Sequence, residues 1–345
     1  MRTCWVIDHP AHFQLFRQWI SPTDTLVITR RAELDVMLQR GFDQPILRVE
    51  RVCGGFVRKV STGWRRERKV RHFLMNNNVE RIISKGAPFE LRAAKKLVAE
   101  RWYISDTEVN KIAHRLARSA ATHILLPDSW TGTLRHTHSY PGLLPNAYIT
   151  ALPEFTQPID STAVDTTAVS TIHRDSTPPA ANDDSTKDGE KLTENFLVFH
   201  RQLIGGGIHD KLEIIDYYSA LEEIEVDFVS EVEGEVKDFD TAWNLPNELS
   251  RYDGVLTGST TLAAEAAVQG VPTFLISKAN RGFLDVLEPY PHFYQWRDDD
   301  LTGPAFVAVR DAWLASMRRC RIEGYSPILA ETKSRLIELW GEPVA

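Results

Sequence analysis

The chain has 345 residues, of which 43% are hydrophobic and 25% charged, and its formal net charge is -7. This length fits two domains of ordinary size, and this composition is typical of globular domains with buried cores. The negative net charge argues against a general nucleic-acid binder. No apolar run approaches the roughly 18 residues that a membrane span requires.

Three scattered cysteines, Cys4, Cys53 and Cys320, indicate neither a disulfide framework nor a metal cluster. The N-terminal residues lead directly into an expected strand, and their apolar run is too short for a signal peptide. We therefore expect a cytoplasmic protein without a transmembrane segment.

The first half of the chain alternates between short apolar runs and helical patterns. We expect six or seven strands with helices between them, the clearest strands being 3–7, 26–29, 46–49, 80–84, 101–104 and 123–126. This alternation predicts a parallel sheet covered by helices, and hence a Rossmann-like domain at 1–155.

A basic stretch at 51–75 interrupts this pattern. It contains eight Arg and Lys residues together with Trp64, Val70, Phe73 and Leu74. Such a segment is typical of an amphipathic helix on an anionic membrane surface or against an acidic partner. An ordinary solvated helix face explains the same pattern.

Residues 156–191 are rich in Ser, Thr, Asp, Pro and Ala, and we expect them to be a flexible linker or insertion. The α/β pattern resumes afterwards, with strands expected at 196–199, 226–230, 254–257 and 273–277. This predicts a second Rossmann-like domain at 192–345, whose last helix could pack back on the first domain. Two such domains would face each other across a cleft.

The segment 252–277 is the most informative part of the second domain. Gly258 permits a tight turn after a strand, and Ser259, Thr260 or Thr261 can cap the helix that follows. The free amides and the dipole of that helix start favour a phosphate. Glu265 lies one turn further on, where its carboxylate could reach a vicinal diol. Taken alone, the same residues are also explained by an ordinary capped helix with a solvated Glu265.

The loop after the first strand contains Asp8, His9 and His12 at the carboxyl end of the sheet, where this fold class binds its ligands. A neutral imidazole at His12 could act as general base towards a hydroxyl group. Asp106 ends another strand of the same sheet and could orient that imidazole. Polar loop residues that cap the first helix are the simpler alternative.

A glycine run follows the first strand of the second domain. Gly205, Gly206 and Gly207 would let the backbone approach a bulky anion, and Arg201 and His209 flank them. Arg201 could donate charge-assisted hydrogen bonds to phosphate oxygens. The run lacks the Lys-Ser/Thr of a Walker loop and the GxGxxG pattern of dinucleotide-binding proteins.

Metal binding has little support in the sequence. His136 and His138 have no third ligand at a recognisable spacing, and no nucleophile elbow or paired-carboxylate spacing stands out. We therefore expect no metal and no cofactor.

The motifs together resemble an archaeal family of unknown function that is predicted to contain glycosyltransferases. The sequence Val6-Ile-Asp-His-Pro-Ala-His-Phe13 is similar to the opening of that family, and Gly258-Ser-Thr-Thr-Leu-Ala-Ala-Glu-Ala-Ala267 to its strongest motif. Further motifs occur in the same order, at Gly86-Ala-Pro88, Ser105-Asp-Thr-Glu108, Leu126-Pro-Asp128, Tyr140-Pro-Gly142, Ala147-Tyr148 and His209-Asp210. The match covers most of the chain except 156–191.

The resemblance implies the GT-B fold, since that family looks related to the peptidoglycan N-acetylglucosaminyltransferase and to UDP-N-acetylglucosamine 2-epimerases. It implies that the turn and helix at 258–265 hold a donor diphosphate and that Glu265 binds the nucleotide ribose. It also implies a His base oriented by an Asp, at His12 and Asp106. Ser259 departs from the family, which often has a second glycine there, and the 156–191 insertion is a further departure.

These observations predict a metal-independent glycosyltransferase that uses a nucleotide-diphosphate sugar. Its substrate-binding residues would include Asp8, Arg201, Glu265 and the two glycine-containing loops. The basic stretch suggests an anionic or lipid-linked acceptor, or a cell-surface glycan, at the membrane surface. An epimerase of the same fold and a non-catalytic sugar-nucleotide-binding protein are the alternatives.

Overall fold

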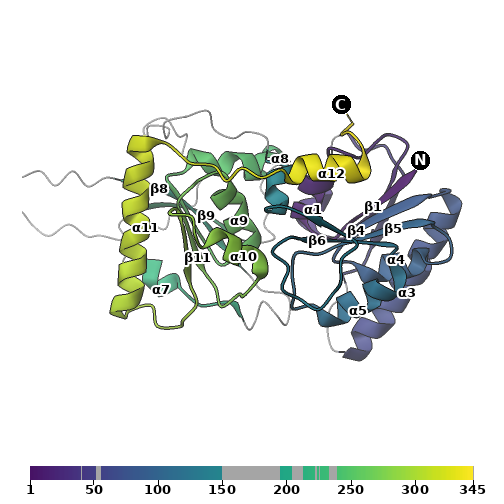
Figure 1. Cartoon of the computed structure of the whole chain (residues 1–345), viewed down its shortest axis with the longest axis horizontal. Helices are drawn as coiled ribbons and strands as arrows, with labels where there is room; N and C mark the ends of the chain where they lie inside the picture. The colour runs from purple at the N-terminus through teal and green to yellow at the C-terminus, as the bar shows by residue number, and fades with distance from the viewer. Residues whose placement is uncertain are drawn as a thin grey trace, which may run out of the picture.

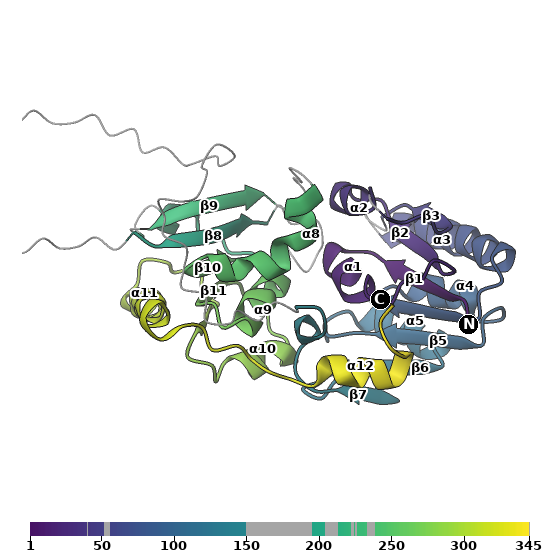
Figure 2. The same cartoon turned by 90° about the horizontal axis from the view of Figure 1, so that it is seen from above.

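The computed structural model describes residues 1–39, 41–51, 56–149, 195–203, 213–221, 224, 226–232 and 239–344. These residues form two α/β lobes that lie side by side (Figures 1 and 2). The insertion expected at 156–191, and with it the expected domain boundaries, lies outside the described residues.

The N-terminal lobe is built on a parallel sheet of seven strands in the order β3-β2-β1-β4-β5-β6-β7. Short apolar runs between polar turns form the strands, as the sequence predicted. Their bounds are β1 (Thr3–Ile7), β2 (Thr25–Thr29), β3 (Ile46–Val49), β4 (Arg81–Lys85), β5 (Glu100–Ile104), β6 (His123–Pro127) and β7 (His138–Tyr140).

Helices cover both faces of this sheet, because alternate side chains of each strand point to opposite faces. Cys4 and Val6 pack with α3, α4 and α5, whereas Trp5 and Ile7 pack with α1, α2 and α12. The helices of this lobe span α1 (Pro10–Phe16), α2 (Ala32–Met37), α3 (Phe56–Asn76), α4 (Pro88–Ala94) and α5 (Lys111–Ala120), with a 3-10 turn η1 (Leu144–Ala147).

The C-terminal lobe has a parallel sheet of five strands in the order β12-β11-β10-β8-β9. The strands are β8 (Leu197–Gln202), β9 (Asp227–Val232), β10 (Gly254–Thr257), β11 (Thr273–Ile276) and β12 (Phe293–Trp296). The helices are α7 (Tyr218–Leu221), α8 (Phe239–Glu248), η4 (Leu249–Arg251), α9 (Thr260–Val268), α10 (Gly282–Leu287), α11 (Pro304–Glu323) and α12 (Thr332–Trp340).

The unit from β10 to β11 has the local structure that the sequence predicts. Ser259 caps α9, and its hydroxyl accepts a hydrogen bond from the amide of Leu262 at 3.3 Å. Gly270 follows the helix with a φ of 81°, and a Cβ there would come within 2.6 Å of the backbone of Ser326. Glycine is therefore required at the end of α9.

The last helix, α12, crosses back to the N-terminal lobe (Figure 1). Its Trp340 packs edge-on against Trp19 with 5.3 Å between ring centroids, and against Trp5 and Phe16 at 6.1 Å. One hydrophobic core runs from these rings to Ala263 and neighbouring apolar residues of the C-terminal lobe. The two lobes are thus joined by continuous packing.

The expected doubly wound α/β architecture is confirmed. The elements β7, β12, α8 and α10 were not located from the sequence. In the part of the chain that the structure describes, no helix is both long and apolar enough to cross a membrane.

Candidate functional site

A cavity of about 340 Å³ lies between the two lobes. The N-terminal lobe lines it with residues that follow β1, β4 and β5, at the carboxyl ends of these strands, and with the segment around η1. The C-terminal lobe contributes the first turn of α9 and Phe283 of α10. This is the position at which open α/β sheets bind their ligands.

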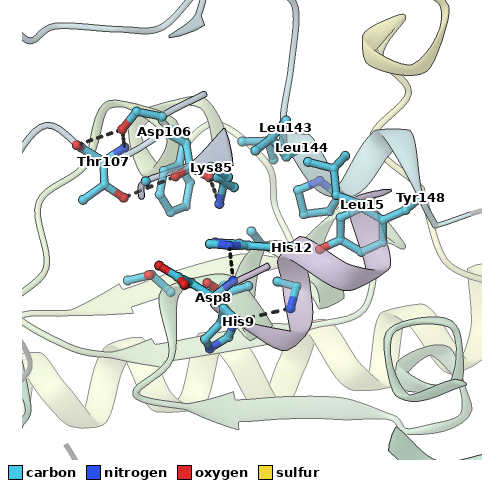
Figure 3. Close-up of a pocket in the computed structure, with 18 of the residues that line it drawn as sticks. Asp8, His9, His12, Leu15, Lys85, Asp106, Thr107, Leu143, Leu144 and Tyr148 are labelled. Carbon is cyan, nitrogen blue, oxygen red and sulfur yellow. Dashed lines mark hydrogen bonds and ion pairs between the residues drawn. The ribbon is translucent and has the colours of Figure 1, made fainter. Parts of the chain in front are cut away.

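Several of the residues predicted from sequence meet in this cavity. Asp8 and His12 come from the loop after β1 and the first turn of α1, and Asp106 comes from the loop after β5. Thr260 and Thr261 approach from the other lobe. Figure 3 shows His12 between Asp8 on one side and Asp106 on the other.

The amides of the first turn of α9 face this space without intrahelical acceptors, because the first turn of any helix lacks them. Thr260 and Thr261 therefore provide the expected anion-binding end of a helix at the cavity wall. Gly258 and Ser259, which directly precede this turn in the chain, do not line the cavity. The amide of Ser259 donates to the hydroxyl of Thr257 at 3.0 Å.

Among the described residues no hydrogen bond joins His12 to Asp106, so the expected orienting role of Asp106 stays a prediction. The Nδ1 of His12 accepts a hydrogen bond from the amide of Asp8 at 3.4 Å. The carboxylate of Asp106 pairs with the ammonium of Lys85 at 2.8 Å and accepts from the hydroxyl of Thr107 at 3.3 Å. Because Nδ1 acts as an acceptor, the proton of a neutral His12 is placed on Nε2.

Both histidines of the β1–α1 loop are held in the neutral form. Burial and the cations Lys85 and Arg31 lower the pKa of His12 well below its ordinary value. Burial, followed by the charge of Arg31, lowers the pKa of His9 to about 3. The side chain of His9 accepts a hydrogen bond from the amide of Ala11 at 3.2 Å. His9 is therefore a polar loop residue that caps α1, which was the simpler of the two explanations of this loop.

Arg66 is the residue of the basic stretch that turns inward. Its guanidinium donates to Asp8 at 2.5 Å and also pairs with Glu90, a fully buried residue of α4. The basic stretch is therefore not entirely a solvated helix face, because Arg66 is buried and contacts Asp8, which lines the cavity. Burial raises the pKa of Glu90 to about 7, and the charge of Arg66 opposes that shift.

Glu265 is buried, so the alternative of a solvated carboxylate is wrong. Its Oε1 accepts a hydrogen bond from the hydroxyl of Tyr148 at 2.6 Å, across the lobe boundary. Burial raises the pKa of Glu265 to about 7, while the hydrogen bond from Tyr148 and the charge of Arg201 oppose the shift.

Arg201, another of the predicted residues, does not line the cavity. Arg201 lies within β8 and not in the following loop, and its guanidinium pairs with Glu231 of β9 at 2.7 Å. Gly205, Gly206, Gly207 and His209 lie outside the described residues, so their predicted role stays a prediction.

The structure gives little support to a metal at the His136–His138 pair. His138 stacks on Trp102 with 5.0 Å between ring centroids, next to His123. Over the described ranges, no group of three or more His, Cys, Asp or Glu side chains has the arrangement of a metal site.

Sequence reasoning missed three residues of this site: Lys85, Arg66 and Tyr148. Lys85 ends a predicted strand and is followed by a glycine, so its position at the carboxyl edge of the sheet could have identified it. Tyr148 belongs to a motif of the family resemblance, but sequence reasoning assigned it no role, and Arg66 carried no signal at all. Their partners lie 117 and 58 residues away in the chain.

The two facing Rossmann-like lobes and the cleft between them define an α/β protein with the GT-B fold. No family model and no curated protein sequence matches the chain.

Similar solved structures exist for nearly the whole chain. One, from Listeria monocytogenes, is assigned as a UDP-N-acetylglucosamine 2-epimerase: its TM-score is 0.61 at 10% identity, with 98% of this chain and 95% of that chain covered. The S. aureus MnaA–UDP co-structure has a TM-score of 0.59 at 8% identity, with 98% and 95% covered. MurG from Acinetobacter baumannii has a TM-score of 0.49 at 10% identity, with 98% and 99% covered.

At this level of identity the likeness establishes the fold and nothing finer. The fold class expected from the sequence is confirmed, and the neighbours include UDP-N-acetylglucosamine 2-epimerases, one of the groups that the motif resemblance named. Membership in the family of unknown function stays a prediction.

Proposed function

We propose that this protein is a glycosyltransferase that uses a nucleotide-diphosphate sugar and acts in the cavity between the lobes. The observation that carries the proposal is the shared cavity wall. The first turn of α9, which suits a diphosphate, faces the polar groups after β1, β4 and β5, which suit a hydroxyl group. A donor and an acceptor would therefore meet in one water-restricted space.

The C-terminal lobe would bind the donor. Its diphosphate would accept hydrogen bonds from the amides of Thr260 and Thr261. Arg201 and the 205–207 loop are the other proposed contacts, and Arg201 would have to leave Glu231 to make one. Glu265 would bind the ribose hydroxyls, which requires it to exchange the hydrogen bond from Tyr148 for bonds from the ribose. Helix dipole and backbone amides would stabilise the leaving diphosphate in place of a metal.

The N-terminal lobe would hold the acceptor. An oxygen of the acceptor forms the new bond to C1 of the sugar, the bond from C1 to the diphosphate oxygen breaks, and the hydroxyl proton passes to His12. For this step His12 needs an unprotonated Nε2, so its Nδ1 must carry the proton and donate it, with Asp106 as the proposed partner. Asp106 would then have to leave Lys85, with which it pairs in the unliganded protein.

A nucleotide-sugar panel tests this proposal. We expect one nucleotide sugar to raise the unfolding temperature and to bind in calorimetry, since a ligand at 100 times its Kd adds about 2.7 kcal/mol of stability. Glu265→Ala should weaken donor binding, whereas His12→Ala should abolish transfer and leave donor binding intact. Unchanged activity in both variants contradicts the proposal. Donor binding with neither transfer nor slow donor hydrolysis would identify a non-catalytic binding protein.

Epimerisation of a nucleotide sugar is a second candidate function. It is favoured by the fold, since the neighbour from Listeria monocytogenes with a TM-score of 0.61 is assigned as a UDP-N-acetylglucosamine 2-epimerase. Incubation with UDP-N-acetylglucosamine and no acceptor separates the two functions. An altered sugar configuration, detected by NMR, supports the epimerase.

We further propose that the acceptor is reached at an anionic membrane surface. Along 61–76, 88–97 and 111–120, on α3, α4 with the residues after it, and α5, ten Lys and Arg residues stand against Glu67 when the buried pair Arg66 and Glu90 is left out, although the whole chain is negative. Exposed Trp64 (76%) and Ile112 (70%) lie among these cations. Basic residues around exposed apolar side chains suit a phospholipid headgroup layer.

Vesicle sedimentation tests this surface. We expect binding to vesicles of phosphatidylglycerol and phosphatidylcholine, little binding to phosphatidylcholine alone, and at least tenfold loss in Trp64→Ala with Arg65→Glu and Arg68→Glu. Charge reversal at exposed Arg251 and Lys278 of the C-terminal lobe is the matched control. Equal vesicle binding by the variant of the basic helices and by the control variant would contradict the proposed membrane surface.

A further inference from the structure

Asp8 offers one carboxylate oxygen to the cavity and has the other fixed. Its Oδ1 accepts hydrogen bonds from the hydroxyl of Thr29 and from the guanidinium of Arg66, at 2.5 Å for the latter. Its side chain is 30% exposed and lines the cavity. Oδ2 accepts no hydrogen bond among the described residues, so it is the oxygen that a ligand can reach.

Arg66, which makes one of these contacts, is buried, and its side chain is only 4% exposed. Its three nitrogens donate in three directions: Nε to Glu90, one terminal nitrogen to the carbonyl of Glu50 at 3.2 Å, and the other to Asp8. The planar guanidinium has little freedom when all three are engaged. Asp8 is thereby held in one position by a buried guanidinium and by the hydroxyl of Thr29.

A second carboxylate is held on the opposite side of His12. Asp106 pairs with Lys85 at 2.8 Å (Figure 3). The charges that line the cavity balance, since Asp8 and Asp106 stand against Lys85 and Arg31. Away from the first turn of α9, this end of the cavity therefore has no excess of cations, and its carboxylates accept hydrogen bonds from hydroxyl groups.

The wall beyond His12 is apolar. Leu15, Leu143 and Leu144 lie together on that side, next to Tyr148 (Figure 3). A pyranose ring has the matching character, because hydroxyl groups surround its edge while its C–H groups form an apolar face. The cavity therefore offers acceptors for the edge and an apolar surface for the face.

We propose that the N-terminal end of the cavity binds an uncharged sugar, that Asp8 accepts a hydrogen bond from one of its hydroxyls, and that Arg66 is the residue that positions Asp8. The inference rests on the proposed function in one respect, since it makes this sugar the glycosyl acceptor. Any phosphate of a lipid-linked acceptor then lies outside the cavity, towards the basic helices. Arg66 acts through Asp8 and does not touch the substrate.

The first experiment measures binding of small neutral sugars by saturation-transfer NMR. The probes are the methyl glycosides of glucose, galactose, mannose and N-acetylglucosamine, with glucose 6-phosphate as the charged comparison. We expect at least one methyl glycoside to bind, and glucose 6-phosphate to bind no more tightly than methyl glucoside. Absence of binding by all four glycosides, or tenfold tighter binding of the phosphate, overturns the proposal.

Substitutions then test the two roles. Asp8→Asn keeps the shape of the side chain and leaves Arg66 paired with Glu90, so the fold should survive while glycoside affinity falls about tenfold. Arg66→Met should produce the same loss, and Arg66→Lys should restore part of the affinity. Arg251→Met and Lys278→Met remove exposed cations of the C-terminal lobe and serve as controls. Unchanged affinity in Asp8→Asn overturns the hydroxyl contact.

A parallel titration with UDP separates this inference from the proposed function. If Arg66 positions Asp8, then Arg66→Met loses glycoside affinity and keeps UDP affinity, whereas general unfolding would lower both. UDP binding without glycoside binding contradicts the inference and leaves the donor site intact. Glycoside binding without binding of UDP or any nucleotide sugar contradicts the proposed transferase and leaves the sugar site standing.

Discussion

The hydroxyl of Tyr148 donates to the carboxylate of Glu265 at 2.6 Å, and this bond connects the two lobes at the edge of the cavity. The two residues lie 117 positions apart in the chain. Both are buried. A residue expected to bind the ribose of a donor is therefore occupied by the facing lobe before any donor arrives.

Tyr148→Phe removes this hydrogen bond with little change in shape. Stability should fall by about 1 kcal/mol, the usual net value of such a bond. Nucleotide affinity should rise, because the ligand no longer competes with Tyr148 for Glu265. Urea unfolding and calorimetric titration with UDP measure the two effects. A lower affinity for UDP would instead show that Tyr148 itself contacts the nucleotide.

Stability should depend on pH through Glu265. Its pKa is raised from 4.5 to about 7 by burial, so the folded protein favours the protonated form. This contribution is complete below pH 4.5 and is lost as the pH rises towards 7.

Comparison with Glu265→Gln isolates this effect from Glu90, whose pKa is also raised to about 7. Between pH 5 and pH 8 the stability of the wild type should fall relative to the variant by roughly 2 to 3 kcal/mol. Urea unfolding at both pH values provides the measurement, and parallel curves for the two proteins would contradict the assigned shift.

The parts of the fold that depend on local sequence were predictable. The apolar runs around Val6 and Leu256 are short and bounded by polar turns, so they predict buried parallel strands. Ser259 and Gly270 mark the two ends of α9 by their own side-chain and backbone preferences. These signals require no knowledge of distant residues.

The electrostatic partners were not predictable, because they are set by tertiary contacts. Arg66 lies among arginines and lysines that look alike in the sequence, and its burial depends on Asp8 and Glu90, which are 58 and 24 residues away. The approach of Lys85 to Asp106 likewise follows from the pairing of β4 with β5. For this reason nothing in the sequence indicated that Asp106 pairs with Lys85.

Lys85→Met should change the protonation of His12 as well as free Asp106. Lys85 is the largest charge that lowers the pKa of His12, after burial. In the wild type, we expect turnover to stay constant when the pH is lowered through 6.5, because His12 is still neutral at that pH. In Lys85→Met the pKa of His12 should rise, so turnover should start to fall at a higher pH than in the wild type. The dependence of kcat on pH measures the shift, and Lys95→Met, an exposed lysine of the same lobe, is the control.

The last prediction concerns the attachment of α12. Trp340 fills the space between Trp5, Phe16 and Trp19, so Trp340→Ala leaves a cavity and loses most of the apolar area that holds the helix. We expect a loss of about 3 to 5 kcal/mol in urea unfolding. Trp64→Ala is the matched control, because its side chain is 76% exposed and its loss should cost no more than about 0.5 kcal/mol. Equal stability of the two variants would mean that α12 is held by contacts other than Trp340.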